Sequence, residues 1–242
     1  MNKKDLEQFI SKYHLNGLVE SVTWNSTENK ELTVKFVTPS QDCAGFVNTK
    51  DLGLGNSNIS IYSTSQFNKL LYIIDDFMTI DVVKGNQNIP YQLNIKDKNF
   101  DLDYYLSSED LIPETATVNE PENYDVEFDI DEDFIKNFTK AYSALEKPDQ
   151  FTLRCNVEDG EKFIEITVGN RDTFANKIKL RQPADFLIGT DLMAFSAVNF
   201  REILNVNKNV SGKIKVSEIG LMKLEFTEDD TTSTYFIVKL SS

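Results

Sequence analysis

The sequence predicts an α+β protein made of two repeated domains, each with two helices packed on antiparallel sheets. A ten-residue pattern, aromatic-Ser-x-x-x-Phe-x-x-(Leu/Ile)-Leu, occurs at residues 62–71 and again at residues 195–204. Two further helix-like segments, residues 7–13 and 132–138, form a second pair in the same order and at nearly the same spacing. Short apolar runs separated by turn residues surround these segments, as is typical of strands. Internal similarity of this kind indicates a duplicated domain.

The length of 242 residues fits two domains of ordinary size. We expect the first domain over residues 1–106, a connector over 107–123 and the second domain over 124–242. No apolar run approaches the ~20 residues that cross a bilayer, and the N-terminus lacks the apolar stretch of a signal peptide. We interpret Cys43 and Cys155, which fall in apparent strands of different halves, as buried free thiols in a reducing compartment.

The first half predicts a helix over residues 2–14, because Leu6, Phe9, Ile10 and Tyr13 follow the i, i+3, i+4, i+7 spacing of one helix face. A second helix is expected over residues 65–75. The strands expected in this half are 18–24, 31–37, 43–48, 59–62, 78–83, 91–95 and 100–106.

The second half repeats this order after the connector, whose lack of periodicity is typical of a linker. A helix is expected over residues 132–146, with an apolar face of Phe134, Ile135, Phe138, Tyr142 and Leu145. Another helix is expected over 199–207. The strands expected in this half are 125–130, 151–157, 162–168, 173–181, 192–195, 213–217, 221–227 and 233–240.

The residues do not predict an active site. His14 is the single histidine, and no Ser or Cys partner is placed beside it by spacing, so a histidine-based triad is not supported. The acidic pairs fall at expected turns or strand edges, where solvated carboxylates are common. The glycines of Gly53-Leu54-Gly55 are not followed by the rest of a dinucleotide-binding loop. We therefore expect a protein without enzymatic activity, cofactor or metal.

The order of elements resembles that of DNA sliding clamps, the trimeric ring-shaped processivity factors of tailed phages, archaea and eukaryotes. The paired patterns at 62–71 and 195–204 carry this resemblance. Residues 174–180 are similar to an edge strand of such clamps, and residues 233–240 resemble the last strand before the clamp tail. The resemblance covers nearly the whole chain. It implies the DNA clamp fold, with three subunits in a ring and helices that line a central hole around duplex DNA.

A DNA-lining role requires basic helix faces although the net charge of the chain is −14. Lys136, Lys140, Ser143 and Lys147 follow i, i+4, i+7 and i+11 spacing and would form one stripe opposite an apolar helix face. The alternative interpretation is an ordinary solvated face. A few mobile lysines suit non-specific, salt-sensitive association with DNA. The residues expected to face DNA are Lys4, Lys12, Lys69, Lys136, Lys140, Lys147, Arg201 and Lys208.

Two segments with opposite charge are candidates for the subunit contact. Residues 100–105 alternate apolar and acidic side chains, and residues 176–181 alternate apolar and basic ones. Exposed edge strands can pair with another chain, and a head-to-tail pairing can close a ring. The alternative is a charged edge that guards against aggregation. The residues expected at this contact are Asp101, Asp103, Tyr105, Lys177, Lys179 and Arg181.

The resemblance also implies a docking pocket for partner peptides, bordered by the connector and the last strand. Leu111, Ile112 and Pro113 form an apolar island in an acidic connector, although simple packing onto the body would also explain them. The residues implied for this pocket are Leu111, Ile112, Pro113, Tyr235, Phe236 and Val238.

The function implied by the resemblance is that of a DNA polymerase sliding clamp, a homotrimer that tethers the replicative polymerase. Its partners would be double-stranded DNA, a DNA polymerase and an ATP-dependent clamp loader, with no membrane. We expect a viral or phage-like source and an intracellular location, in the host cytoplasm if a phage encodes it. Two alternatives are a clamp-like processivity factor that binds DNA as a monomer and a structural or interaction β-protein with an acidic surface.

Overall fold

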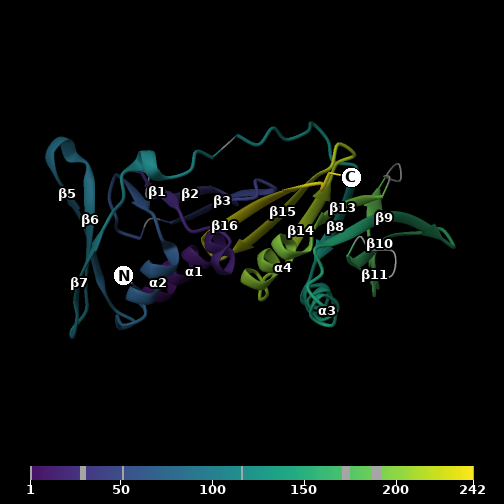
Figure 1. Ribbon diagram of the computed structural model, residues 1–242, viewed down its shortest axis with the longest axis horizontal. Helices are drawn as coiled ribbons and strands as arrows, with labels where there is room; N and C mark the ends of the chain where they lie inside the picture. Colours follow the sequence, from purple (N-terminus) through teal and green to yellow (C-terminus); the bar gives the residue numbers. More distant parts are fainter. Residues whose placement is uncertain are drawn as a thin grey trace. The chain divides into compact units, whose positions relative to one another are not determined.

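The computed structural model describes residues 2–27, 31–50, 52–115, 117–170, 175–186 and 192–241 (Figure 1). Two compact units make up the chain. The first contains residues 1–39, 45–116 and 229–233, and the second contains residues 40–44, 117–228 and 234–242. Each unit therefore includes a short segment from the other half of the sequence. The expected domain bounds at 106 and 124 stay a prediction.

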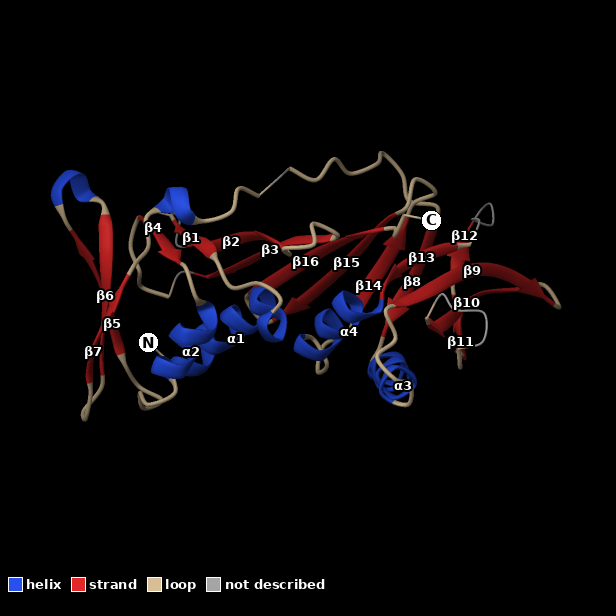
Figure 2. Cartoon of the chain, in the orientation of Figure 1, coloured by secondary structure: helices blue, strands red, loops and turns tan. Residues whose placement is uncertain are grey.

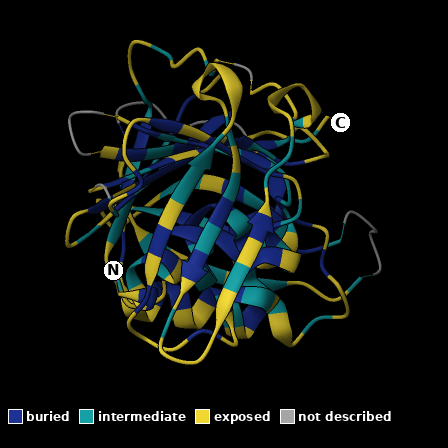
Figure 3. Cartoon of the chain, turned by 90° about the vertical axis from the view of Figure 1, so that its left-hand side faces the viewer, coloured by how far each residue is buried: buried dark blue, intermediate teal, exposed yellow. Residues whose placement is uncertain are grey.

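The first unit has two α-helices, α1 (Lys3–His14) and α2 (Thr64–Leu71), which contact each other (Figure 2). One group of strands has the order β4-β1-β2-β3 and another the order β5-β6-β7. More and less exposed residues alternate along β6 and most of β7, which with β5 face the viewer in Figure 3. The strand bounds are β1 (Val22–Ser26), β2 (Glu31–Val37), β3 (Cys43–Lys50), β4 (Ser57–Ile61), β5 (Thr79–Lys84), β6 (Pro90–Lys96) and β7 (Asp101–Tyr105).

An aromatic cluster under the two helices forms the core of the first unit. Trp24 of β1 is fully buried, and the centroid of its ring lies 5.7 Å from those of both Phe9 and Phe67. The indole N–H of Trp24 donates to the hydroxyl of Tyr13 at 3.1 Å, so its one polar atom is satisfied. The cluster joins α1, α2 and β1 because Phe9, Phe67 and Trp24 come from these three elements.

The second unit also has two contacting α-helices, α3 (Glu132–Ser143) and α4 (Ala197–Val206). Its strands form the orders β11-β10-β9-β13 and β12-β8-β14-β15-β16. The strand bounds are β8 (Val126–Ile130), β9 (Gln150–Glu158), β10 (Glu161–Gly169), β11 (Ile178–Pro183), β12 (Asp185–Phe186), β13 (Met193–Ser196), β14 (Gly212–Val216), β15 (Leu221–Glu228) and β16 (Thr231–Val238).

Phenylalanine takes the place of tryptophan in the core of the second unit. Phe200 of α4 is fully buried, with its ring centroid 4.7 Å from that of Phe138 on α3 and 4.6 Å from that of Phe151 on β9. Phe134 meets the same ring edge-on at 6.3 Å. This cluster holds the α3–α4 pair to the sheet as the Trp24 cluster holds α1 and α2.

The repeated ten-residue pattern has a direct structural cause. Its serine is the N-cap of the helix in both units: the Ser63 hydroxyl accepts from the Gln66 backbone N–H, and the Ser196 hydroxyl accepts from that of Asn199, each at 3.3 Å. The phenylalanine four residues later is the fully buried Phe67 or Phe200. The expected α+β fold class of two repeated helix-and-sheet domains is therefore confirmed.

Several expected bounds are wrong. The strand expected from residue 18 begins at Val22, because Leu15 and Asn16 adopt positive φ angles of 48° and 54° and turn the chain first. The second helix ends at Leu71 instead of residue 75, and the third ends at Ser143 instead of residue 146. The strand expected over 173–181 begins at Ile178, and its residues 173 and 174 lie outside the described part of the chain. Strand β12 was not expected.

The two cysteines differ in burial. Cys43 is a buried free thiol, as expected, and its burial raises the pKa of the thiol. Cys155 is a free thiol of intermediate burial, so the expectation of full burial is wrong for it. Its strand, β9, leaves the covered part of its sheet toward the β9–β10 turn, where burial decreases along the strand.

We expect Ser63→Ala and Ser196→Ala each to lower the free energy of unfolding by about 1 kcal/mol, because each change leaves a helix N–H without its cap. Urea denaturation followed by circular dichroism would measure this. Ser143→Ala is the control, because Ser143 is exposed at the other end of a helix, and a change of no more than roughly 0.5 kcal/mol is expected. Equal effects of all three changes would contradict the capping role.

Candidate functional site

Six of the eight cations expected to face DNA are exposed, and two are not. The exposed ones are Lys4, Lys69, Lys136, Lys140, Lys147 and Lys208. Lys12 is 3% exposed, so its side chain is not on the accessible surface of α1. Arg201 is half-buried. The sequence could not separate these cases, because a lysine on a helix is usually solvated.

The basic stripe on the third helix is shorter than its spacing predicts. Lys136 and Lys140 lie four residues apart on α3 and are both exposed. Lys147 lies beyond the last helical residue and has a φ of 46°, so it does not continue the stripe along the helix. Its contact with DNA stays a prediction, as does that of Lys208, which follows α4.

Arg201 joins the two helices of the second unit. Its guanidinium lies 4.5 Å from the ring centroid of Tyr142 on α3, and it forms an ion pair with the neighbouring Glu202, which is 4% exposed. Stacking on an aromatic face leaves the plane of a guanidinium ordered. Arg201 is therefore a fixed and partly neutralised cation, in contrast to the exposed lysines of α3.

The acidic and the basic candidate segments are edge strands of their sheets. Strand β7, with Asp101, Asp103 and the 69% exposed Tyr105, ends the order β5-β6-β7. Strand β11, with the exposed Lys179 and Arg181, ends the order β11-β10-β9-β13, and Lys177 precedes it. Each edge thus carries charge of one sign on its exposed side chains.

Residues of the neighbouring strands form ion pairs and hydrogen bonds with these charged edge residues. Asp101 forms an ion pair with Lys96 at 3.1 Å and accepts from Asn94 at 2.8 Å, and these contacts hold the pKa of Asp101 below its usual value. Lys179 pairs with Glu165 at 2.9 Å, and Arg181 pairs with Glu158 at 2.7 Å. Most of these charged groups are exposed, while the Glu165 side chain is 22% exposed. Exposed ion pairs are individually weak.

The apolar island of the connector covers part of the first unit. Leu111 is 60% exposed and ends a short 3₁₀ turn, Glu109–Leu111. Ile112 and Pro113 line a cavity of about 210 Å³. The other residues that line this cavity are Thr23, Asn25, Lys35, Glu109, Glu114 and Thr115.

An ion pair and a hydrogen bond of Glu120 hold the second half of the connector in the second unit. Glu120 forms an ion pair with Lys223 of β15 at 2.9 Å and accepts from the hydroxyl of Tyr124 at 3.1 Å. The side chain of Lys223 is 14% exposed, and its ammonium lies 5.8 Å from the ring centroid of Phe236. Lys223 thus lies against both the connector and the last strand.

The three candidate pocket residues of β16 differ in accessibility. Tyr235 is fully buried, and its hydroxyl accepts from the Asn207 amide at 3.2 Å, so it is a core residue. Phe236 is 4% exposed and lies beneath the Lys223 ammonium. Val238 is 43% exposed and remains the accessible member of the set.

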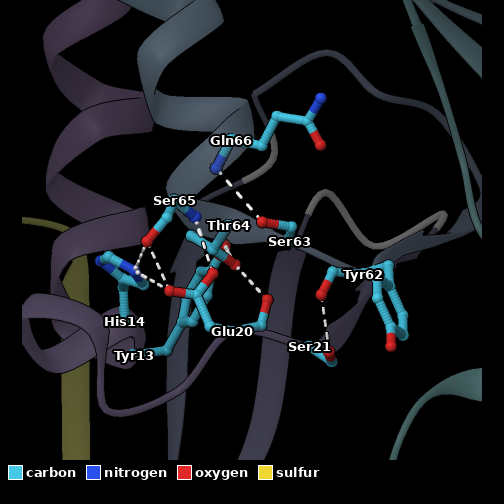
Figure 4. Close-up of polar contacts among 9 residues, drawn as sticks. All are labelled: Tyr13, His14, Glu20, Ser21, Tyr62, Ser63, Thr64, Ser65 and Gln66. Atoms are coloured by element: carbon cyan, nitrogen blue, oxygen red, sulfur yellow. Dashed lines mark hydrogen bonds and ion pairs between the residues drawn. The ribbon is translucent and has the colours of Figure 1, made fainter.

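A polar network that the sequence did not predict joins the two helices of the first unit (Figure 4). The Glu20 carboxylate accepts from the Ser65 backbone N–H at 2.9 Å and from the Ser65 hydroxyl. His14 Nε2 lies 3.3 Å from Glu20 Oε1 and 3.2 Å from Ser65 Oγ. The backbone carbonyl of Glu20 accepts from the Thr64 N–H at 2.9 Å. Glu20 therefore caps the first turn of α2.

This network brings a serine, a histidine and a glutamate together but does not form a catalytic triad. A triad uses both ring nitrogens of the histidine, one toward the acid and one toward the nucleophile. Here Glu20 and Ser65 both approach Nε2, and the Ser65 hydroxyl donates directly to Glu20. No local pattern could predict this network, because Ser65 is 45 residues from Glu20.

Two other classes of site have no candidate among the described residues. No group of three or more His, Cys, Asp or Glu side chains in this part of the chain is arranged to hold a metal ion. None of the described helices is long and apolar enough to cross a membrane.

Comparison with solved structures shows a full-length likeness to one kind of protein. A structure of A. fulgidus PCNA bound to the C-terminal region of FEN-1 matches with a TM-score of 0.74 and 15% identity, covering 100% of this chain and 97% of that one. PCNA from Entamoeba histolytica matches with a TM-score of 0.74 and 12% identity, with the same coverage. PCNA from Thermococcus kodakaraensis matches with a TM-score of 0.73 and 13% identity, covering 99% of this chain and 98% of that one. The expected DNA clamp fold is confirmed.

The likeness lies in the structure, since the identities are between 12% and 15%. No protein-family model matches the sequence, and no curated protein matches it.

Glu20 makes the first unit sensitive to acid. Partial burial alone would raise the pKa of Glu20, but hydrogen bonds from Ser65 and His14 outweigh it and lower the pKa below the ordinary 4.5. A carboxyl with a lowered pKa stabilises the fold above its unfolded value, and this contribution is lost as the pH falls through the folded value.

We therefore expect Glu20→Gln to lower the free energy of unfolding by about 1 kcal/mol at pH 7, as the loss of a helix cap does. The difference from the wild type should shrink as the pH falls below the ordinary 4.5 of this carboxyl. Urea denaturation at a series of pH values would measure it. Glu31→Gln, at an exposed position of the same unit, is the control. A difference between Glu20→Gln and wild type that does not change with pH would contradict the capping role of the carboxylate.

Proposed function

We propose that this chain is a subunit of a DNA sliding clamp, a ring that encircles duplex DNA and tethers a DNA polymerase. The observation that carries the proposal is the likeness of the whole chain, both units included, to PCNA structures at a TM-score of 0.74. The fold points to a scaffold and not to an enzyme. The intracellular location, the clamp loader as a partner and the phage-like source remain expectations.

The proposed ring is a homotrimer closed by β7 of one copy against β11 of the next. The acidic exposed side chains of one edge and the basic ones of the other support this pairing. In the isolated subunit, Asp101 and Lys179 are paired with Lys96 and Glu165. In the ring, the edge strand of the next copy would lie beside these ion pairs. Asp101 and Lys179 would therefore not be buried without a partner of opposite charge.

The proposed DNA contacts come from the exposed helix lysines. Lys136 and Lys140 of α3 support them best, because they are exposed and four residues apart on one helix. Lys4 and Lys69 would add a contact from the first unit. Such a set neutralises few phosphates, which suits a protein that slides and that a closed ring retains.

Partner peptides are proposed to dock beside the connector and the end of β16. The likeness to a PCNA structure that contains the C-terminal region of FEN-1 supports this proposal. Among the six residues of this proposal, the exposed ones are Leu111, Pro113 and Val238. Ile112 is partly covered, and Tyr235 and Phe236 would act only as the support beneath a docked peptide.

We expect the double variant Lys177→Glu/Lys179→Glu to be monomeric, because like charges would then face each other across the contact. Multi-angle light scattering should give a mass of about three times 27.6 kDa for the wild type and the mass of one chain for the variant. Adding Asp101→Lys/Asp103→Lys should partly restore the trimer.

Lys35→Glu/Lys239→Glu is the matched control for the same charge change at exposed positions outside both edges, and it should stay trimeric. A trimeric Lys177→Glu/Lys179→Glu variant would refute the assignment of the edges. A monomeric wild type would instead favour the alternative of a monomeric processivity factor.

We expect Lys136→Ala/Lys140→Ala to weaken duplex DNA binding and to lower the slope of log affinity against log salt. The slope should fall by roughly one for each phosphate contact that is lost. Fluorescence anisotropy with a labelled duplex at several salt concentrations would measure this, while light scattering checks that the mass is unchanged. Lys35→Ala/Lys98→Ala removes two exposed lysines elsewhere as a control. An unchanged slope in the α3 variant would refute the DNA-facing assignment.

A further inference from the structure

The turn between α2 and β5 carries an exposed apolar patch. Tyr72 is 82% exposed and Phe77 is 83% exposed, more than any other large apolar side chain in the described part of the chain. Ile73, between them in sequence, is 47% exposed, whereas Ile74 is buried. Single exposed apolar residues are common, but adjacent ones on one short turn mark an interaction surface. We name Tyr72, Ile73 and Phe77 the turn patch.

The backbone of this turn is held in place, although its side chains are exposed. Lys3 is 8% exposed, and its ammonium donates to the carbonyl of Ile74 at 2.8 Å and to that of Tyr72 at 3.2 Å. The Lys3 N–H donates to the carbonyl of Asp76 at 2.9 Å, and Asn2 forms a β-bridge with Phe77. Rings presented on a fixed backbone lose little conformational entropy when a partner covers them.

The turn patch adjoins the acidic edge at β7. Asp75, which lies within the turn, donates its backbone N–H to the Asp97 carboxylate at 2.6 Å and accepts from the Asn99 amide at 3.2 Å. The loop 97–100 that holds Asp75 leads directly into β7, and its last residue, Phe100, is 45% exposed. The turn that carries the patch is therefore tied by hydrogen bonds to the loop that leads into the edge strand β7.

We propose that a second copy of this chain covers the turn patch in the same contact that pairs its β11 with β7. This inference rests on the proposed ring and adds an apolar surface to the contact between its subunits. The occupant follows from charge and position: the edge beside the patch is acidic, and the described strand edge of opposite sign is the chain's own β11. In that copy α3 packs against β11, so both elements belong to the surface that approaches the patch.

The turn patch gives the contact a kind of stability that the charged edges do not have. The edge residues Asp101, Lys179 and Arg181 are exposed, and salt screens ion pairs of exposed groups. Burial of Tyr72 and Phe77 removes apolar surface from water, a contribution that salt does not weaken. Aromatic anchors of this kind carry much of the binding energy in many protein interfaces. The ring would therefore persist in salt that screens its edge charges.

Two measurements test this inference. Hydroxyl-radical footprinting of the wild type, at concentrations below and above the onset of self-association, should show protection of Tyr72 and Phe77 only in the associated form. Tyr62, which is 60% exposed in the same unit, should react equally in both. If the mass rises while Tyr72 and Phe77 stay fully reactive, the inference is overturned and the proposed ring stands.

The second measurement uses Tyr72→Ser/Phe77→Ser, which removes two rings that are 82% and 83% exposed. Within the subunit the Tyr72 ring lies 5.7 Å from the Lys3 ammonium, which also donates to backbone carbonyls and so stays hydrogen-bonded in the variant. Sedimentation equilibrium should show self-association weakened by about tenfold or more, with an unchanged melting temperature. Tyr62→Ser/Ile89→Ser, at two other exposed apolar positions, should associate as the wild type does. Equal association of the turn-patch variant and the wild type overturns the inference alone. A wild type that is monomeric at every concentration overturns the proposed ring and this inference together.

Discussion

The structure depends on one requirement in each unit: a pair of short helices must bury an aromatic cluster against a sheet. Helix α2 has eight residues and α4 has ten, too few for a stable helix on their own. Phe67 packs on Trp24 in the first unit, and Phe200 packs on Phe138 and Phe151 in the second. The serine caps at Ser63 and Ser196 fix where each helix begins, so that its phenylalanine reaches the cluster. This is why cap and phenylalanine recur together in the sequence.

The sequence predicts correctly those elements whose own residues show the periodicity of a helix or a strand. Helix α1 and strand β2 have clear periodicity, and their expected bounds agree with the structure to within one residue. The end of α2 could not be read in this way, because Ile74 continues the apolar spacing but lies buried in the turn that Lys3 holds. The Glu20 cap could not be predicted either, since its partner Ser65 comes from a distant part of the chain. Edge strands β7 and β11 were recognisable because each alternates apolar residues with charges of one sign.

The accessibility of the candidate site residues could be predicted even less well than the elements. The sequence predicts that Lys12 belongs to a basic helix face, yet its side chain is 3% exposed. Lys3 of the same helix is also buried, and its ammonium donates to backbone carbonyls that follow α2. A lysine side chain can cover apolar surface and still reach a polar partner, so its position on a helix does not determine which way its charge points. Tyr235 is the opposite case, an apolar residue expected at a docking surface that is needed in the core.

The accessible basic surface is therefore smaller than the sequence predicts, and this bears on how such a protein could hold DNA. Each helix pair keeps few exposed lysines, Lys4 and Lys69 in the first unit and Lys136 and Lys140 in the second, within a chain of net charge −14. Because non-specific affinity rises with the number of phosphates neutralised, this set alone would bind DNA weakly at physiological salt. Retention would then have to come from enclosure, and enclosure lasts only as long as the subunit contacts do. In the proposed ring, the retention of DNA would therefore depend on the edges β7 and β11 and on the turn patch, where a stable contact would not hinder sliding.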